Sequence, residues 1–313
     1  MGQLIKLRDY ISRYEIDPYH YTGQYIRLKK HQWERINKAW EERQFDPYLV
    51  PFPAEPDHGE EKASFWEKWP FRKQREHEEP VSESSSFAAE EDPDMLFSHV
   101  PASNNDLKHE FLDKIYRFQL KWASSTIREQ SDFDRRYFYD ETLQFFLKRL
   151  PDHNLYMHNA VLEVKNAAVE IGPVLITPAG IQCISWITGK KEDILVGSGE
   201  RFWTIKSGKY TKKTLNPLLD LHRTTTIISR IIKSRGIDFP VMKRLIFEHG
   251  YADFQTPPYE VEVTDKRCFD EWFSKMRNLS SPIKHDQLRA VKAILDCTLT
   301  RSRIRSDWEE KGN

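Results

Sequence analysis

Two carboxylates and a lysine in the middle of the chain have the types and spacing that hydrolytic metal chemistry requires. Glu163 and Lys165 are two residues apart in an apolar run, so they would share one face of a β-strand. A metal ligand would then lie beside an ammonium group that orients a water molecule. A turn at residues 166–168 would bring Glu170 opposite Glu163. The favoured interpretation of this Glu-x-Lys pattern is an ordinary solvated face of an amphipathic strand.

The following segment, residues 169–189, has the pattern of a β-hairpin. Its two apolar runs are residues 174–176 and 181–184, and they flank the turn Thr177-Pro178-Ala179-Gly180. Apolar runs of this length around a Pro/Gly turn are typical of paired antiparallel strands. We therefore expect this segment to fold as a β-hairpin.

Residues 138–254 resemble the nuclease-related domain family called NERD, a branch of the restriction-endonuclease-like PD-(D/E)xK nucleases. The hydrophobic pattern of residues 171–189, together with Pro178-x-Gly180 and Gly189, follows the family motif. Further family landmarks follow in order, namely Trp203, the helix-opening pair Asn216-Pro217, the helical residues 218–232 and the apolar residues 245–247. The resemblance covers a little over a third of the chain. It implies an α/β fold with a restriction-endonuclease-like mixed sheet flanked by helices.

The positions that carry catalysis in this family hold other residues here. Gly172 stands where the family has its metal-binding Asp, and Ser185 and Ile187 stand at the Glu and Lys of its E-x-K motif. Glu141 matches the helical glutamate of the family. Loss of the three signature groups removes both metal ligands and the cation that orients water, and each loss commonly costs several kcal/mol of transition-state stabilisation.

We therefore expect a catalytically inactive nuclease-related protein that serves as a nucleic-acid-binding or protein-interaction module, with no metal and no cofactor. The alternative is an active Mg²⁺-dependent nuclease with a migrated site built from Glu141, Glu163, Lys165 and Glu170. The order of elements disfavours this alternative, because the E-x-K strand of the family follows the P-x-G turn and Glu163 precedes it.

The net charge of zero hides a separation of charge along the chain. Residues 51–100 carry 13 acidic and 5 basic side chains, whereas residues 189–250 carry 6 acidic and 13 basic ones. This separation indicates an acidic linker attached to a basic domain. A solvated surface explains such charges in general, but the resemblance makes six of them candidates for contacts with the phosphates of DNA or RNA: Lys206, Lys209, Lys212, Lys213, Arg223 and Arg230.

Composition and periodicity divide the chain into four parts. Residues 1–50 are expected to form a helical N-terminal arm, and residues 51–105 an acidic disordered linker. Residues 106–268 form the predicted NERD-like domain, and residues 269–313 a helical C-terminal extension.

The N-terminal arm carries an aromatic stripe. Ile26, Trp33 and Trp40 recur at a spacing of seven residues, as on one face of a helix. Packing of this stripe on the main domain is the favoured interpretation, and capture of a protein partner is the alternative. In the second case, deletion of residues 1–50 would abolish partner capture and leave the core folded.

Other functional classes find little support in the sequence. Three widely spaced cysteines and eleven dispersed histidines give neither a disulfide framework nor a zinc motif. The phosphate-loop, dinucleotide-binding and nucleophile-elbow motifs are missing from the sequence. Because the chain has neither a long apolar run nor the pattern of a secretory signal, we expect a cytoplasmic protein that does not associate with membranes.

Overall fold

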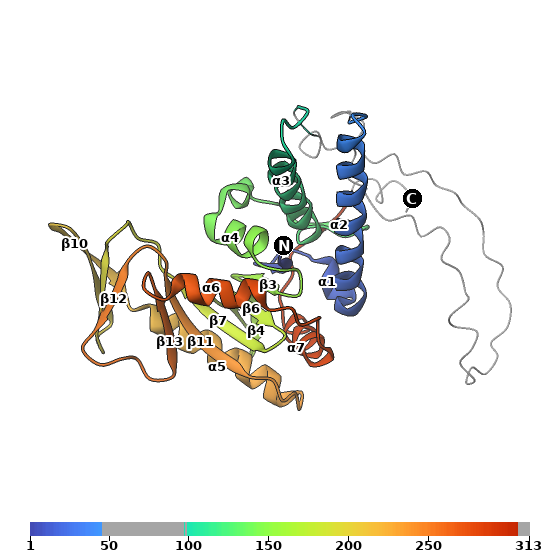
Figure 1. Ribbon diagram of the computed structural model, residues 1–313. Helices are drawn as coiled ribbons and strands as arrows, with labels where there is room; N and C mark the ends of the chain where they lie inside the picture. Colours follow the sequence, from blue (N-terminus) through green and yellow to red (C-terminus); the bar gives the residue numbers. More distant parts are fainter. Residues whose placement is uncertain (46–96, 98, 306–313) are drawn as a thin grey trace, which may run out of the picture.

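The computed structural model describes residues 1–45, 97 and 99–305, and a six-stranded mixed sheet lies at its centre (Figure 1). In spatial order the strands are β1 (Gln3–Leu7), β3 (Leu155–His158), β6 (Val174–Thr177), β7 (Gly180–Trp186), β11 (Val241–Phe247) and β13 (Val261–Asp265). Strand β6 is antiparallel to both of its neighbours, and the other three pairings are parallel.

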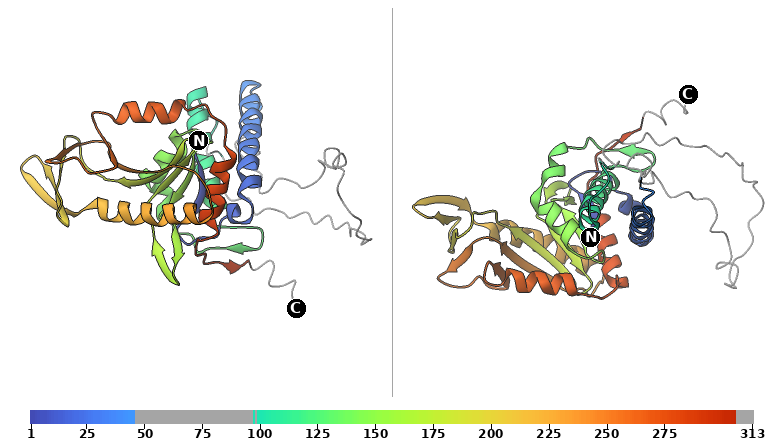
Figure 2. Two further views of the ribbon diagram at one scale, coloured as in Figure 1. Left: turned by 90° about the horizontal axis from the view of Figure 1, so that it is seen from below. Right: turned by 45° about the horizontal axis from the view of Figure 1, so that its top comes forward.

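Helices cover both faces of this sheet (Figure 2). One face carries α5 (Pro217–Ser234) and α7 (His285–Leu295), and the other carries α4 (Glu141–Arg149) and α6 (Phe269–Asn278). The side chains of β7 alternate between these layers, because Ile181 and Cys183 pack with α5 whereas Ile184 packs with α4 and α6. The predicted α/β class is therefore confirmed.

The predicted hairpin is present as β6 and β7, which pair in antiparallel register around Gly180. Gly180 has a φ of +152°, and a Cβ atom at this position would lie 2.9 Å from the carbonyl oxygen of Pro240. A residue without a Cβ is required here because both the backbone conformation and the neighbouring chain exclude a side chain.

The predicted start of α5 is also confirmed. The side chain of Asn216 accepts a hydrogen bond of 2.9 Å from the backbone amide of Leu218, and Pro217 occupies the first helical position. Asn as the cap and Pro at the first position together satisfy a free amide and fix the backbone for the helix.

The N-terminal region contains α1 (Arg13–Ile16) and α2 (Pro18–Glu41), and α2 packs beside α3 (Asn104–Trp122). The predicted aromatic stripe lies on α2, where the ring of Trp33 is 5.2 Å from the ring of Phe111. Ile26 and Trp40 are likewise partly buried against the main core. These contacts agree with packing of the stripe on the body of the protein.

The helical prediction for residues 1–50 is wrong for residues 3–7, which form strand β1. All five residues are buried, and they pair in parallel with β3. Burial on both faces gives a strand no period-two pattern, and its hydrogen-bond partner lies about 150 residues away in the sequence. The helical spacing of seven belongs only to the segment that follows Asp17.

Four further strands form a second sheet in the spatial order β10 (Tyr210–Leu215), β9 (Phe202–Ser207), β8 (Ile194–Gly197) and β12 (Tyr251–Phe254). A separate two-stranded hairpin contains β4 (Val161–Val164) and β5 (Ala167–Glu170). The remaining elements are the 3-10 helix η3 (Arg135–Tyr139) and the short pair β2 (Glu129–Gln130) and β14 (Arg303–Ile304).

Two predictions concern regions that the structure describes only in part. The acidic linker predicted for residues 51–105 lies mostly outside the described residues, and the division of the chain into four domains stays a prediction. The described portion includes no helix with the length and apolar character needed to cross a membrane.

Candidate active site

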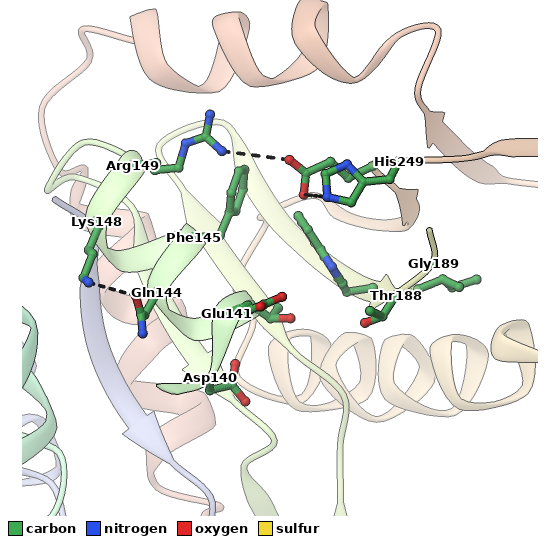
Figure 3. A pocket seen from close by; sticks show the side chains of 13 residues that line it. Asp140, Glu141, Gln144, Phe145, Lys148, Arg149, Thr188, Gly189 and His249 are labelled. Atoms are coloured by element: carbon green, nitrogen blue, oxygen red, sulfur yellow. Dashed lines mark hydrogen bonds and ion pairs between the residues drawn. The ribbon is translucent and has the colours of Figure 1, made fainter. Parts of the chain in front are cut away.

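A pocket of about 540 Å³ opens beside the carboxyl ends of strands β7 and β11 of the central sheet (Figure 3). Strands β7 and β11 are parallel neighbours, so the residues that follow them emerge at the same edge. The pocket is lined by residues 186–189 after β7, by residues 248–249 after β11, and by α4 with its capping residue. Its volume lies in the range typical of small-molecule sites.

The first turn of α4 brings two carboxylates to the pocket. Asp140 caps the helix, because its Oδ1 accepts a hydrogen bond of 2.7 Å from the amide of Leu143. Glu141 follows as the first helical residue and is exposed in the pocket wall. Both side chains suit the positive end of the helix dipole.

The last turn of α4 brings two cations. The ammonium group of Lys148 lies 2.6 Å from Asp113 Oδ1 and 2.8 Å from Gln144 Oε1, so neighbouring side chains already bind it. The guanidinium of Arg149 lies over the rings of Phe145 and Phe273, at 4.9 and 4.5 Å from their centroids. Since the side chain of Arg149 is half exposed, its planar group can also bind an anion in the pocket.

The third wall carries an acid and a histidine at adjacent positions. Glu248 Oε1 lies 3.9 Å from Arg149 Nη1, and Glu248 Oε2 lies 3.9 Å from His249 Nε2. The side chain of Glu248 is 21% exposed and that of His249 is 59% exposed. Glu248 therefore stands between a cation and an imidazole that can exchange protons with a bound molecule.

A second histidine supports the pocket from behind. His158 is buried, and its Nε2 lies 3.6 Å from Asp140 Oδ2 while its Nδ1 lies 3.1 Å from the Tyr156 hydroxyl. Burial lowers the pKa of His158, and the nearby Asp140 carboxylate opposes this effect only in part. Burial likewise raises the pKa of Tyr156. We infer that this histidine is neutral and holds Asp140 in place.

Of the four residues of the predicted migrated site, the pocket is lined only by Glu141. Glu163 and Lys165 belong to the β4–β5 hairpin, in which Glu163 pairs with Ala168 and Val161 pairs with Glu170. The expected juxtaposition of Glu163 and Glu170 is therefore wrong, because the turn is formed by Lys165 and Asn166 and not by residues 166–168. Throughout residues 1–45, 97 and 99–305, no three His, Cys, Asp or Glu side chains are grouped to hold a metal ion.

The three substituted motif positions lie at the same end of the sheet as the pocket, and Ile187 is the one of the three that lines it. A Cβ atom on Gly172 would lie 3.0 Å from Asp220 Oδ2 of α5, and the amide of Gly172 donates a hydrogen bond to Thr224. Ser185 is half-buried on β7, and Ile187 packs with the apolar cluster around Trp203. Alternation along β7 therefore turns Ser185 and Ile187 toward the layer that contains α5.

The six predicted phosphate contacts lie on two elements. Four belong to the β9–β10 hairpin, where all are exposed: Lys206, Lys209, Lys212 and Lys213. The other two are exposed on α5, where Arg223 forms an ion pair with Asp220 and donates a hydrogen bond of 3.0 Å to the carbonyl oxygen of Glu170. No comparable contact of Arg230 is found in the described residues, and all six side chains stay candidates.

Sequence reasoning missed Arg149, Glu248 and His249. The available signal was the Glu-His pair directly after the apolar residues 245–247, because polar residues at the carboxyl end of a parallel strand commonly form binding sites. Recognition of that signal required knowledge that β11 pairs in parallel with β7.

Comparison with known proteins gives a partial match. The chain is 40% identical over 120 residues to an RNA 2',3'-cyclic phosphodiesterase from Geobacillus stearothermophilus. The match covers 38% of this chain and 36% of that protein, so the chain spans about a third of the length of this relative. No family model matches the chain, and no solved structure matches it.

This likeness corrects the functional expectation from the sequence. Both the inactive nuclease-related module and the Mg²⁺-dependent nuclease with a migrated site are contradicted, because the relative is named as an RNA cyclic phosphodiesterase. The substitutions at Gly172, Ser185 and Ile187 removed one known arrangement of catalytic groups, and the alternative arrangement considered in the sequence analysis did not include Arg149, Glu248 or His249. The likeness to an RNA-acting enzyme is compatible with nucleic acid as a partner.

Proposed function

We propose that the chain is a phosphodiesterase that hydrolyses 2',3'-cyclic phosphates of RNA in the pocket between α4 and the ends of β7 and β11. The observation that carries the proposal is the gathering of Arg149, Glu248 and His249 with Glu141 around one cavity. The partial likeness to an RNA 2',3'-cyclic phosphodiesterase supports the choice of substrate.

The phosphate would bind at the guanidinium of Arg149. This group is held over two aromatic rings and beside Glu248, which fixes its orientation before the substrate arrives. A planar guanidinium can bind two non-bridging oxygens of a phosphate and stabilise the charge that grows on them in the transition state. Lys148 adds positive charge at the same wall of the pocket.

His249 and Glu141 would exchange the protons. They come from different walls of the pocket, His249 from the segment after β11 and Glu141 from the start of α4 (Figure 3). One of these two side chains accepts a proton from the attacking water, while the oxygen of that water forms a bond to phosphorus. The other gives a proton to the ribose oxygen that leaves, so the products are a phosphate monoester and a free hydroxyl.

We propose that side-chain acid–base catalysis carries this reaction without a cofactor. The supporting argument is that a histidine, a carboxylic acid and a guanidinium supply the base, the acid and the charge stabilisation that the reaction needs. Activity should then persist in EDTA, and loss of activity in EDTA with recovery on addition of Mg²⁺ would overturn this part of the proposal.

We also propose that the core is related to the restriction-endonuclease-like fold, as the resemblance to NERD implies. The support is the order of elements, in which α4 is followed by β3, the β6–β7 hairpin, α5 and β11. The family landmarks come in the same order along the sequence. This proposal concerns the fold of the core alone, and the catalytic roles of the pocket residues do not depend on it.

The test is hydrolysis of 2',3'-cyclic AMP by the purified chain, followed by separation of the nucleotide products. We expect turnover by the wild type, a loss of about 100-fold or more in His249→Ala and Glu141→Gln, and a similar loss in Arg149→Ala. His285→Ala is the matched control, because His285 is an exposed histidine on α7, outside the pocket. Equal rates of hydrolysis in His249→Ala and in the control would contradict the assignment of this pocket as the active site.

A further inference from the structure

The second sheet has one face that packs on the core and one that faces solvent. Residues directly opposite one another on neighbouring strands share a face. Leu195, Trp203 and Ala252 belong to the inner face and are buried, and the first two are part of the apolar cluster that contains Phe247. The residues that alternate with them define the outer face.

The outer face gathers exposed apolar side chains. Ile194, Phe202 and Leu215 are 38%, 53% and 52% exposed, and the register places all three on this face. The guanidinium of Arg201 lies 5.9 Å from the centre of the Phe202 ring. An exposed aromatic ring next to a cation is a platform on which a nucleobase can stack.

The same register divides the lysines of the β9–β10 hairpin between the two faces. Lys206 pairs with Thr211 and also with Ile194, and Lys213 pairs with Thr204, so both lysines belong to the outer face. Lys212 pairs with Ile205 and therefore points to the opposite side. The sequence alone grouped these lysines together, whereas the strand pairing separates them.

The charge of the outer face favours a polyanion. Lys206 and Lys213 are exposed, and within the described part of the chain no carboxylate forms an ion pair with either one. Three carboxylates lie near this face. Asp253 is on the opposite edge strand β12, and Glu192 precedes β8 and is bound by Lys266. Glu200 is exposed two residues before Phe202, and the cationic Arg201 lies between them in the sequence. The β10 side of the face is therefore positive.

The outer face begins beside the proposed active site. Tyr251, the first residue of β12, follows His249 by two positions and pairs with Ile194. The order β12, β8, β9 and β10 then leads away from the pocket to the tip of the hairpin, at the left in Figure 1. With strands about 4.8 Å apart, the face is roughly 14 Å wide, which is enough for a few nucleotides.

We propose that the outer face of β10-β9-β8-β12 binds single-stranded RNA, with Phe202 stacking on a base and Lys206 and Lys213 contacting phosphates. The inference rests on the proposed function, because it supplies the polymer that precedes the cyclic phosphate in the pocket. Single-stranded RNA fits better than a duplex, because a stacking ring needs a base with an open face.

The test measures binding of the full chain to a fluorescent single-stranded RNA of about ten nucleotides at several salt concentrations. Phe202→Ala should weaken binding by about fivefold or more. The double variant Lys206→Ala/Lys213→Ala should reduce the slope of log affinity against log salt by about 1.4, because each phosphate contact on a single strand contributes about 0.7. Lys212→Ala should leave this slope unchanged.

Hydrolysis of 2',3'-cyclic AMP, measured on the same variants, separates this inference from the proposed function. Full mononucleotide turnover together with weakened RNA binding supports the outer face as an RNA site. RNA binding that is unchanged in Phe202→Ala, or weakened as much by Lys212→Ala as by Lys206→Ala/Lys213→Ala, overturns the inference while turnover of the mononucleotide still stands. Absence of turnover with face-specific RNA binding overturns only the proposed function.

Discussion

Glu248 connects the two groups on which the proposed chemistry depends. One of its carboxylate oxygens lies near Arg149 and the other near His249, both at 3.9 Å. Both distances are longer than a hydrogen bond, and the stacking of Arg149 on Phe145 and Phe273 helps to keep its guanidinium in place. A single carboxylate thus orients the anion-binding group and the proton-exchanging group together.

His158 makes stability depend on pH. Its pKa in the folded protein is lowered by burial, so the unfolded chain binds a proton more readily at this position. The stability contributed by neutral His158 is fully present above the ordinary value of 6.5 and is lost as the pH falls below it. Asp140 and Arg136 also act on this histidine, because Asp140 raises the pKa of His158 and Arg136 lowers it.

We therefore expect the free energy of unfolding to fall between pH 7 and pH 5, and to fall less steeply in His158→Gln. Urea unfolding at several pH values measures both slopes. A variant with the same slope as the wild type would show that other groups, such as the buried His153, account for the dependence.

Among the secondary-structure elements, helix α4 positions most of the charged side chains of the pocket. Its first turn carries Asp140 and Glu141, and its last turn carries Lys148 and Arg149, so one short helix presents groups of both charges. The helix is only nine residues long. Its position therefore depends on its cap and on packing more than on intrinsic helical preference.

Asp140→Ala should destabilise the protein by about 0.5–2 kcal/mol, because the capping hydrogen bond to Leu143 is lost. It should also slow hydrolysis, because the pocket residues of α4 shift. Asp140→Asn is the matched variant, since asparagine caps a helix as well as aspartate does. Thermal unfolding and turnover of 2',3'-cyclic AMP test the pair, and equal stability of both variants would contradict a capping role.

Elements with local signals could be predicted from the sequence. The β6–β7 hairpin follows from two apolar runs around Gly180, and α5 follows from Asn216-Pro217, because in both cases the deciding residues are neighbours. Strand β1 could not be predicted in this way, since its hydrogen bonds go to β3. The two faces of the β9–β10 hairpin also required the register.

The candidate site was predictable only at Glu141. That residue was found by resemblance, whereas Arg149 ends α4 and His249 follows β11, and the two meet because α4 packs on the face of the sheet that contains Ile246 of β11. A linear pattern records which residues follow each other and not which strands pair in parallel. The residues Glu163 and Lys165 had the right local spacing but belong to a hairpin outside the pocket.

In the whole molecule, the N-terminal residues are part of the main core. Strand β1 is buried in the central sheet, and α2 buries Tyr25 and Ile36 against the same apolar cluster. The expectation that residues 1–50 can be deleted while the core stays folded therefore conflicts with the structure. Loss of β1 would expose the edge of β3 and the apolar residues beneath it.

Deletion of residues 1–16, which removes β1 and α1, should abolish cooperative thermal unfolding or make the protein insoluble. Circular dichroism and differential scanning calorimetry on the truncated chain measure the effect. A truncated protein that unfolds cooperatively near the wild-type temperature would contradict an integral role for β1.

The proposed reaction of the whole molecule is phosphodiester hydrolysis in one pocket by Arg149, Glu141 and His249. The most direct measurement is a phosphorus NMR time course of 2',3'-cyclic AMP with the full chain, in parallel with His249→Ala. We expect the wild type to convert the cyclic phosphate signal into a phosphate monoester signal, and we expect the rate of this conversion to be about 100-fold lower with the variant. A cyclic phosphate signal that persists with the wild type, or that decays equally fast with both proteins, would contradict it.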